Sequence, residues 1–273
     1  MRRWIYAALS VLAMNFPLQA EKPQTLLVCA ASDLTYCLEE LNAAFQKAHP
    51  EITVKATLGA SGNLLAQIQN GAPYDVFLSA DIQYPKALID AKAAEADSLT
   101  PYATGHLVVW TTTPGIDVKG GAGSLTADAI QKIAIANPEH APYGRAAKAA
   151  LEHLGLWEKL REKIVLGENI AQTAQFVETG NAQAGIVALS LVLSPKLANR
   201  GSYAAIPLDS YPALEQGAVI TKKGGANPAA KTYLEFLKSP EARAIFDRYG
   251  FLLPEGGRAA SQSKIETRES EIR

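Results

Sequence analysis

The chain has 273 residues, of which 48% are hydrophobic and 19% are charged, as in ordinary globular domains. Its 26 lysines and arginines nearly balance 27 aspartates and glutamates, for a formal net charge of −1. This balance excludes a strongly basic surface for nucleic acid and a polybasic patch for membranes. The length suffices for two domains or one large one.

The first 20 residues have the pattern of a secretory signal peptide. Arg2 and Arg3 precede an apolar run over residues 4–14, and a small residue, Ala20, ends the segment. We expect cleavage near Ala20 and export to the periplasm, with a buried first helix as the alternative. In an exported protein, Cys29 and Cys37 can be oxidised to a disulfide. The simpler interpretation is that both are small, buried apolar residues.

After Ala20 the pattern alternates between strand and helix, which predicts an α/β fold with mainly parallel sheets. The passage over residues 93–105 is polar and rich in Thr and Ala, and we assign no element to it. Residues 255–273 lack a hydrophobic period, and we expect this tail to be disordered. The expected strands are 25–29, 52–58, 75–79, 106–113, 133–136, 163–166, 184–189, 203–208 and 217–221. The expected helices are 34–48, 63–69, 82–91, 125–132, 145–154, 171–178, 228–238 and 240–249.

Small residues and serines gather where strands give way to helices. Ser32 follows Ala30-Ala31, and Ser61 lies within Gly59-Ala60-Ser61-Gly62. The first turn of a helix has N–H groups without intrahelical acceptors, and these favour an anion. Taken singly, each serine is most simply a helix cap, but together the helix starts would meet at the carboxyl edges of parallel strands. The apparent starts are at Ser32, Ser61, Asp81, Tyr143 and Ile170.

Catalytic and metal sites find little support. A nucleophile elbow needs a second glycine where this chain has Asn63, so a hydrolase using Ser61 and His140 is only an alternative hypothesis. The two cysteines are eight residues apart, and no histidine pair has the spacing of metal ligands. We therefore expect a binding protein that is not an enzyme and needs no cofactor.

Six segments, in this order, resemble the periplasmic molybdate/tungstate-binding proteins of ABC importers, over about residues 26–253. The resemblance implies a two-lobed type II periplasmic-binding-protein fold, with mixed sheets flanked by helices and two inter-lobe crossings, near residues 104–107 and 209–216. The expected lobes are 21–105 plus 216–254 (lobe 1) and 106–215 (lobe 2). The segments are Ala30-Ala31-Ser32-Asp33-Leu34, Gly59-Ala60-Ser61-Gly62-Asn63-Leu64, residues 70–81 (NGAPYDVFLSAD), residues 137–144 (NPEHAPYG), residues 185–190 (GIVALS) and Arg248-Tyr249-Gly250-Phe251.

The resemblance also implies the contacts of the oxyanion. Ser32 and Ser61 would donate hydroxyl and backbone N–H groups, and Tyr143 and Ile170 would donate backbone N–H groups. Asp33 would add its amide, with its carboxylate turned away as a helix cap; a carboxylate in the pocket would contradict this interpretation. Ala80 would line the site. Ala188 stands where several relatives carry a tyrosine donor, so that donor is missing here.

We therefore expect a monomer that captures molybdate or tungstate, binding the metal only as its oxyanion. The partner would be the membrane permease of an ABC transporter with its ATPase. A pocket made only of donors would reject a protonated phosphate, whose O–H would find no acceptor. The nearest alternative is the same fold binding a different oxyanion or small anion.

Overall fold

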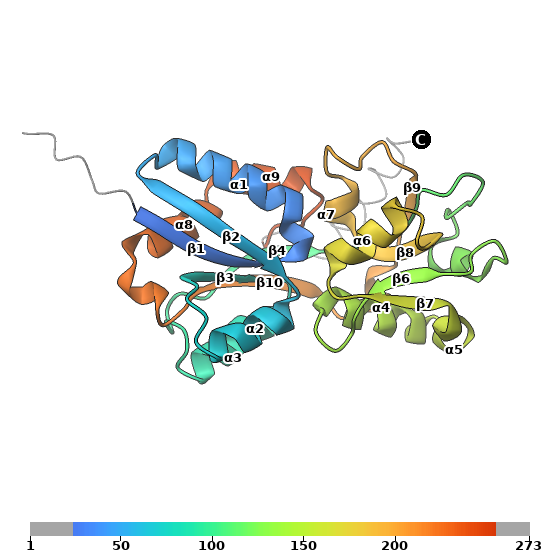
Figure 1. The fold of residues 1–273 in the computed structure, drawn as a ribbon, viewed down its shortest axis with the longest axis horizontal. Coiled ribbons are helices and arrows are strands. Elements are labelled where there is room, and N and C mark those ends of the chain that lie inside the picture. Colours follow the sequence, from blue (N-terminus) through green and yellow to red (C-terminus); the bar gives the residue numbers. More distant parts are fainter. Residues whose placement is uncertain (1–23, 255–273) are drawn as a thin grey trace, which may run out of the picture.

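The computed structural model describes residues 24–254, which form two lobes, each built on a five-stranded mixed sheet (Figure 1). The expected signal peptide and the expected disordered tail lie outside these residues. Within residues 24–254, no helix combines the length and the apolar character that a membrane span requires.

Lobe 1 contains the sheet β2-β1-β3-β10-β4, in which β1 pairs in parallel with β2 and β3, and β10 runs antiparallel to β3 and β4. Helices α1, α8 and α9 cover one face of this sheet, and α2 and α3 cover the other. The strands are β1 (Gln24–Ala31), β2 (Ile52–Gly59), β3 (Val76–Ser79), β4 (Thr100–Gly105) and β10 (Leu214–Ile220). The helices are α1 (Thr35–Ala48), α2 (Ser61–Gln69), α3 (Gln83–Asp90), α8 (Pro228–Leu237) and α9 (Pro240–Arg248).

Lobe 2 repeats this plan with the sheet β7-β6-β8-β5-β9, in which β6 pairs in parallel with β7 and β8. β5 runs antiparallel to β8 and β9. The strands are β5 (Leu107–Thr111), β6 (Ile133–Ala136), β7 (Ile164–Gly167), β8 (Ala184–Ala188) and β9 (Ser202–Ala205). The helices are α4 (Pro142–His153), α5 (Trp157–Leu160), α6 (Ile170–Glu178) and α7 (Leu189–Val192).

The chain crosses between the lobes twice, as the family resemblance implies. The first crossing passes through His106, between β4 and β5, and the second lies between β9 and β10. β10 pairs with β4 from Leu214 onward, so lobe 1 resumes two residues before the expected boundary at 216. Helices α8 and α9 pack on the lobe 1 core. The predicted two-lobed α/β fold is confirmed.

One strand was not predicted, and one predicted helix was wrong. Residues 100–105 form the strand β4, which the polar composition concealed. β4 lies at the edge of its sheet, where Pro101 is tolerated because an edge strand pairs on one side only. Residues 125–132 do not form a helix, since only a 3-10 turn spans Gly121–Thr126. Buried Leu125 and Ile130 are five residues apart, which does not place them on one helical face.

The two cysteines cannot pair in this fold. Cys29 faces the side of β1 that packs against α2 and α3, and Cys37 of α1 belongs to the core on the opposite side of the sheet. Both thiols are free and buried. Burial raises the pKa of both thiols, so they remain protonated and act as small apolar core residues.

Candidate functional site

A small pocket lies between the lobes, where the carboxyl ends of the parallel strands of both sheets meet. In each lobe, the next two parallel strands of the chain lie on opposite sides of the first one, β1 or β6. Open α/β sheets bind ligands at such a reversal of strand order. This interlobe pocket is lined by Ala31, Ser32, Asp33, Gly59, Ala60, Ser61, Ala80, Ala141, Pro142, Tyr143 and Ile170.

Two serine hydroxyls of lobe 1 line the pocket with their protons free to donate. Ser61 is the first residue of α2, and its Oγ accepts the backbone N–H of Ala80 at 3.1 Å. Ser32 begins the 3-10 turn Ser32–Leu34, and its Oγ accepts the N–H of Ala171 from lobe 2 at 3.4 Å. A hydroxyl that accepts a hydrogen bond still carries one O–H donor. Both serines can therefore donate to a ligand in the pocket.

Lobe 2 contributes the amino-terminal ends of two helices. Helix α4 begins at Pro142, which has no N–H, so Tyr143 supplies the first amide. Helix α6 begins at Ile170, and its cap residue Asn169 accepts the N–H groups of Ala171 and Gln172 at 3.1 Å each. That cap leaves the Ile170 N–H for a ligand, because first-turn amides have no acceptor in their own helix.

Backbone dipoles are the source of partial positive charge at the pocket. Among the described residues that line it, none is a lysine or an arginine. The first turns of α2, α4 and α6 reach the pocket, and each helix adds a partial positive charge at this end. Helix α4 starts three residues earlier than its apolar spacing predicted, which brings Tyr143 into its first turn. Such an array of N–H and O–H donors suits an anion.

Asp33 departs from the sequence prediction. Its side chain does not cap α1, because the cap residue of that helix is Leu34 and the side-chain hydrogen bonds of Asp33 go to other groups. Instead its Oδ2 accepts the Tyr143 hydroxyl at 3.0 Å and the Gln216 Nε2 at 2.5 Å. Its Oδ1 has no hydrogen-bond partner among the described residues, although Asp33 lines the pocket. The expected pocket of donors alone is therefore wrong, since a carboxyl group forms part of its lining.

Burial dominates the electrostatics of Asp33, which is only 1% exposed. Removal from water raises the pKa of its carboxyl to about 6, against the lowering effect of the Gln216 and Tyr143 hydrogen bonds. The neighbouring N–H groups of Asp33 and Leu34 also lower this pKa, without forming a hydrogen bond of good geometry to Oδ1. Burial, followed by the Asp33 charge, raises the pKa of Tyr143, so Tyr143 stays a hydrogen-bond donor.

Direct contacts between the lobes hold them closed over the pocket. The Gly62 N–H donates to the His140 carbonyl at 2.9 Å, and the Ser190 hydroxyl donates to the Asp33 carbonyl at 2.8 Å. At the rim, Arg145 of α4 donates to Asp81 at 2.7 Å and to the Tyr84 hydroxyl at 2.6 Å. A Cβ added at Gly62 would lie 2.7 Å from the His140 oxygen, so this approach requires glycine. The structure is therefore a closed form.

Six of the seven residues predicted for the site line the interlobe pocket, and Ala188 does not. Ser32, Asp33, Ser61, Ala80, Tyr143 and Ile170 come together from both lobes. Ala188 is fully buried at the end of β8, where it pairs with Leu107 of β5. Asp81, which the sequence placed at a helix start, accepts the Gln83 N–H and forms an ion pair with Arg145 at the rim.

The alternative of a hydrolytic relay has no geometric support. The Ser61 hydroxyl is engaged by the Ala80 amide rather than by a histidine. The imidazole of His140 is about half exposed and lies 3.7 Å from Glu139. The contribution of His140 to the site is its backbone carbonyl, which accepts the Gly62 N–H.

Sequence reasoning missed Gln216, Ser190 and Arg145. Gln216 is fully buried on β10, and its partner Asp33 lies 183 residues earlier in the chain. A buried glutamine in an apolar strand is the one local signal that could have suggested it, because buried polar groups need partners. Arg145 and Ser190 give no such signal, since their partners belong to the opposite lobe.

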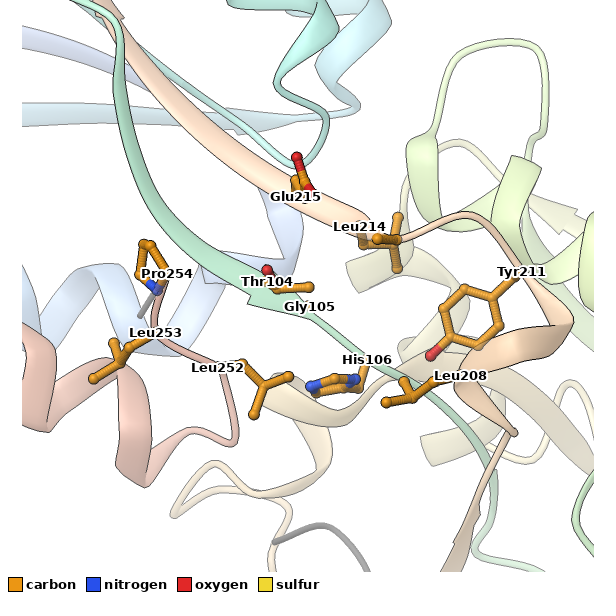
Figure 2. Close-up of a pocket in the computed structure, with 11 residues that line it drawn as sticks. Thr104, Gly105, His106, Leu208, Tyr211, Leu214, Glu215, Leu252, Leu253 and Pro254 are labelled. Atoms are coloured by element: carbon orange, nitrogen blue, oxygen red, sulfur yellow. The ribbon is translucent and has the colours of Figure 1, made fainter. Parts of the chain in front are cut away.

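A larger pocket lies at the hinge, where the crossing segments run side by side (Figure 2). It is lined by Thr104, Gly105, His106, Leu208, Tyr211, Ala213, Leu214, Glu215, Leu252, Leu253 and Pro254. Among the described α-helices, none begins at a residue that lines this hinge pocket. The helix starts thus distinguish the interlobe pocket as the candidate anion site.

Two lobes closed over a small pocket are the architecture of a solute-binding protein, and comparisons agree. The family model for bacterial extracellular solute-binding proteins matches residues 26–252. The molybdate-binding protein ModA of Azotobacter vinelandii is 41% identical over 227 residues, 82% of this chain and 88% of the relative. ModA of Rhodobacter capsulatus is 39% identical over 242 residues, 88% and 93% of the two chains.

Solved structures show the same similarity. The periplasmic molybdate-binding protein of Azotobacter vinelandii matches with a TM-score of 0.80 and 37% identity, covering 84% of this chain and 100% of that one. The chain therefore belongs to the bacterial extracellular solute-binding proteins. The resemblance to molybdate-binding proteins that the sequence motifs predicted is confirmed.

Proposed function

We propose that this protein captures molybdate in the interlobe pocket and delivers it to an ABC importer. The observation that carries the proposal is the donor set around a small closed pocket: two serine hydroxyls and the first-turn amides of α2, α4 and α6. The relatives named molybdate-binding proteins support the choice of oxyanion.

The donor set can offset the entropy that a bound dianion loses. Each hydrogen bond to a charged group contributes about 1.5–3 kcal/mol. The hydroxyls of Ser32 and Ser61 and the amides of Ser61, Tyr143 and Ile170 give five such donors to one dianion. Their sum, about 7.5–15 kcal/mol, is of the same size as the translational and rotational entropy lost on binding, about 4–15 kcal/mol. Closure of the lobes removes water from the pocket and strengthens each of these bonds.

Delivery and location complete the proposal. The protein works in the periplasm as a monomer after removal of residues 1–20, and it passes its cargo to a membrane permease driven by an ATPase. Tungstate binds at the same residues, because it presents the same four oxygens and two negative charges. Light scattering on the mature chain tests the monomeric state, and a stable dimer with and without oxyanion would contradict it.

A second oxyanion is favoured by one observation, the Asp33 carboxyl in the pocket lining. An ionised Asp33 accepts a hydrogen bond through Oδ1, so it can pair with the O–H of hydrogen phosphate. This carboxyl group therefore supports hydrogen phosphate as the competing ligand.

Titration calorimetry of the mature chain with sodium molybdate, tungstate, sulfate and phosphate tests the proposal. We expect saturable heat with molybdate and tungstate and far weaker binding of sulfate and phosphate. Binding of phosphate alone would transfer the function to the second candidate. An absence of heat and of thermal stabilisation with all four anions would refute oxyanion capture.

A further inference from the structure

One carboxyl group stands in an anion pocket without a compensating cation. Asp33 lines the interlobe pocket and is 1% exposed. The Tyr143 hydroxyl and the Gln216 amide both donate to its Oδ2, whereas its Oδ1 has no hydrogen-bond partner among the described residues. A buried charged oxygen without a partner is costly, so the ionised form is less favoured here than in an exposed carboxyl group, even before a ligand arrives.

The groups that surround Asp33 do not neutralise it. Tyr143 of α4, Tyr102 of β4 and Cys37 of α1 interact with it electrostatically, and burial raises the pKa of all three, so they remain uncharged. Helix α7 contributes the neutral hydroxyl of Ser190, which binds the Asp33 carbonyl. His106 is buried at the hinge, next to Gly105 in the chain. The Gly105 backbone packs against the Tyr143 hydroxyl.

A bound dianion would add two negative charges to the same pocket. A nearby like charge favours the neutral form of a carboxyl group. The two donors on Oδ2 keep that oxygen an acceptor, so the proton belongs on Oδ1. A protonated Oδ1 changes from a group that repels an oxyanion into a group that donates to it.

We propose that Asp33 binds the oxyanion as a carboxylic acid, with Oδ2 held by Tyr143 and Gln216 and the Oδ1–H donated to a ligand oxygen. The proton comes from solvent, so each dianion is captured together with one proton. The complex then gains a net charge of −1 rather than −2. This inference rests on the proposed capture of a fully deprotonated oxyanion and makes Asp33 a pH-dependent determinant of its affinity.

The coupling predicts a definite dependence on pH. Burial raises the pKa of Asp33 to about 6 in the free protein, and a bound dianion raises it further. Between these two values the association constant falls about tenfold for each unit of increasing pH, because one proton is taken up per ligand. Below the free-protein value the carboxyl is already protonated, so affinity no longer changes with pH.

Calorimetry with sodium molybdate between about pH 6 and pH 9, in two buffers of different ionisation enthalpy, counts the protons taken up. We expect close to one proton per bound molybdate in the wild type over the sloping part of the range. In Asp33→Asn the amide oxygen replaces Oδ2 as the acceptor and Nδ2 replaces the Oδ1–H donor. This variant should bind without proton uptake and, at the alkaline end, more tightly than the wild type.

Asp81→Asn is the matched control, because it removes the same charge from the rim of the cleft and leaves Asp33 unchanged. It should retain the proton uptake of the wild type. Protonation of the free oxyanion is common to all three proteins and cancels in the comparison.

Molybdate binding by the wild type without proton uptake overturns the proposal and leaves the proposed function standing. A slope retained in Asp33→Asn does the same. If no pH gives binding, the proposed function fails and this inference with it. Should Asp33→Asn not fold, the proton count of the wild type in the two buffers decides by itself.

Discussion

Removal of the Ser61 hydroxyl tests the site most directly. In Ser61→Ala the oxyanion loses one O–H donor, and a hydrogen bond to a charged group contributes about 1.5–3 kcal/mol. The dissociation constant for molybdate should therefore rise roughly 10- to 150-fold, since about 1.4 kcal/mol corresponds to a factor of ten. Titration calorimetry measures the change.

The same substitution also affects the folded state. The Ser61 Oγ accepts the Ala80 N–H at 3.1 Å, and Ala80 is buried, so the variant leaves that amide unpartnered. The cost is about 1–3 kcal/mol. In a protein of this size each kcal/mol lowers the melting temperature by roughly 2–4 °C. A loss of stability must therefore be separated from a loss of ligand contact.

Ser98→Ala provides that separation. Ser98 is buried in lobe 1 away from the interlobe pocket, and its Oγ accepts the Ile220 N–H at 3.0 Å, as Ser61 does for Ala80. Loss of the Ser98 hydroxyl should lower the melting temperature about as much as loss of the Ser61 hydroxyl and leave molybdate affinity unchanged. Wild-type affinity in Ser61→Ala would refute the placement of the site. Equal weakening in both variants would show that the effect acts through stability.

Three further variants test closure and the buried carboxyl. Arg145→Ala removes the partly exposed ion pair with Asp81 across the cleft, which contributes up to about 1 kcal/mol. Molybdate should therefore dissociate up to about fivefold faster in stopped-flow measurements. Lys148→Ala on the same helix should not change the rate. Gly62→Ala places a Cβ 2.7 Å from a backbone oxygen of the other lobe and should prevent ligand-induced compaction in X-ray scattering, unlike Gly123→Ala, where no atom lies within 4 Å. The pKa of Asp33 is about 6 in the folded protein and 3.8 as an isolated group, so the native state binds this proton more tightly. The free energy of unfolding of the ligand-free protein should therefore fall by about 3 kcal/mol as pH rises from about 4 to 6. Urea unfolding should show that Asp33→Asn lacks this loss; an identical pH profile in variant and wild type would contradict the buried carboxyl.

The sequence was informative about local elements and about which residues gather at the site. Ser61 and Ile170 were placed correctly at helix starts because small residues and caps leave a clear local pattern, and parallel strands bring such starts to one edge. Strand β4 was missed because an edge strand needs little apolar patterning. The role of Asp33 was wrong because a helix cap was the only local use available for its carboxylate.

The chain by itself therefore determined the α/β alternation, the order of the helix starts and most of the residues that line the interlobe pocket. Only the tertiary structure decided what Asp33 does, since Tyr143 and Gln216 reach it from 110 and 183 residues away. Contacts between distant residues do not appear in the hydrophobic periodicity of a sequence, because that periodicity depends only on the burial of each residue within its own lobe. The carboxyl in the anion pocket and the contacts that close the cleft belong to this class.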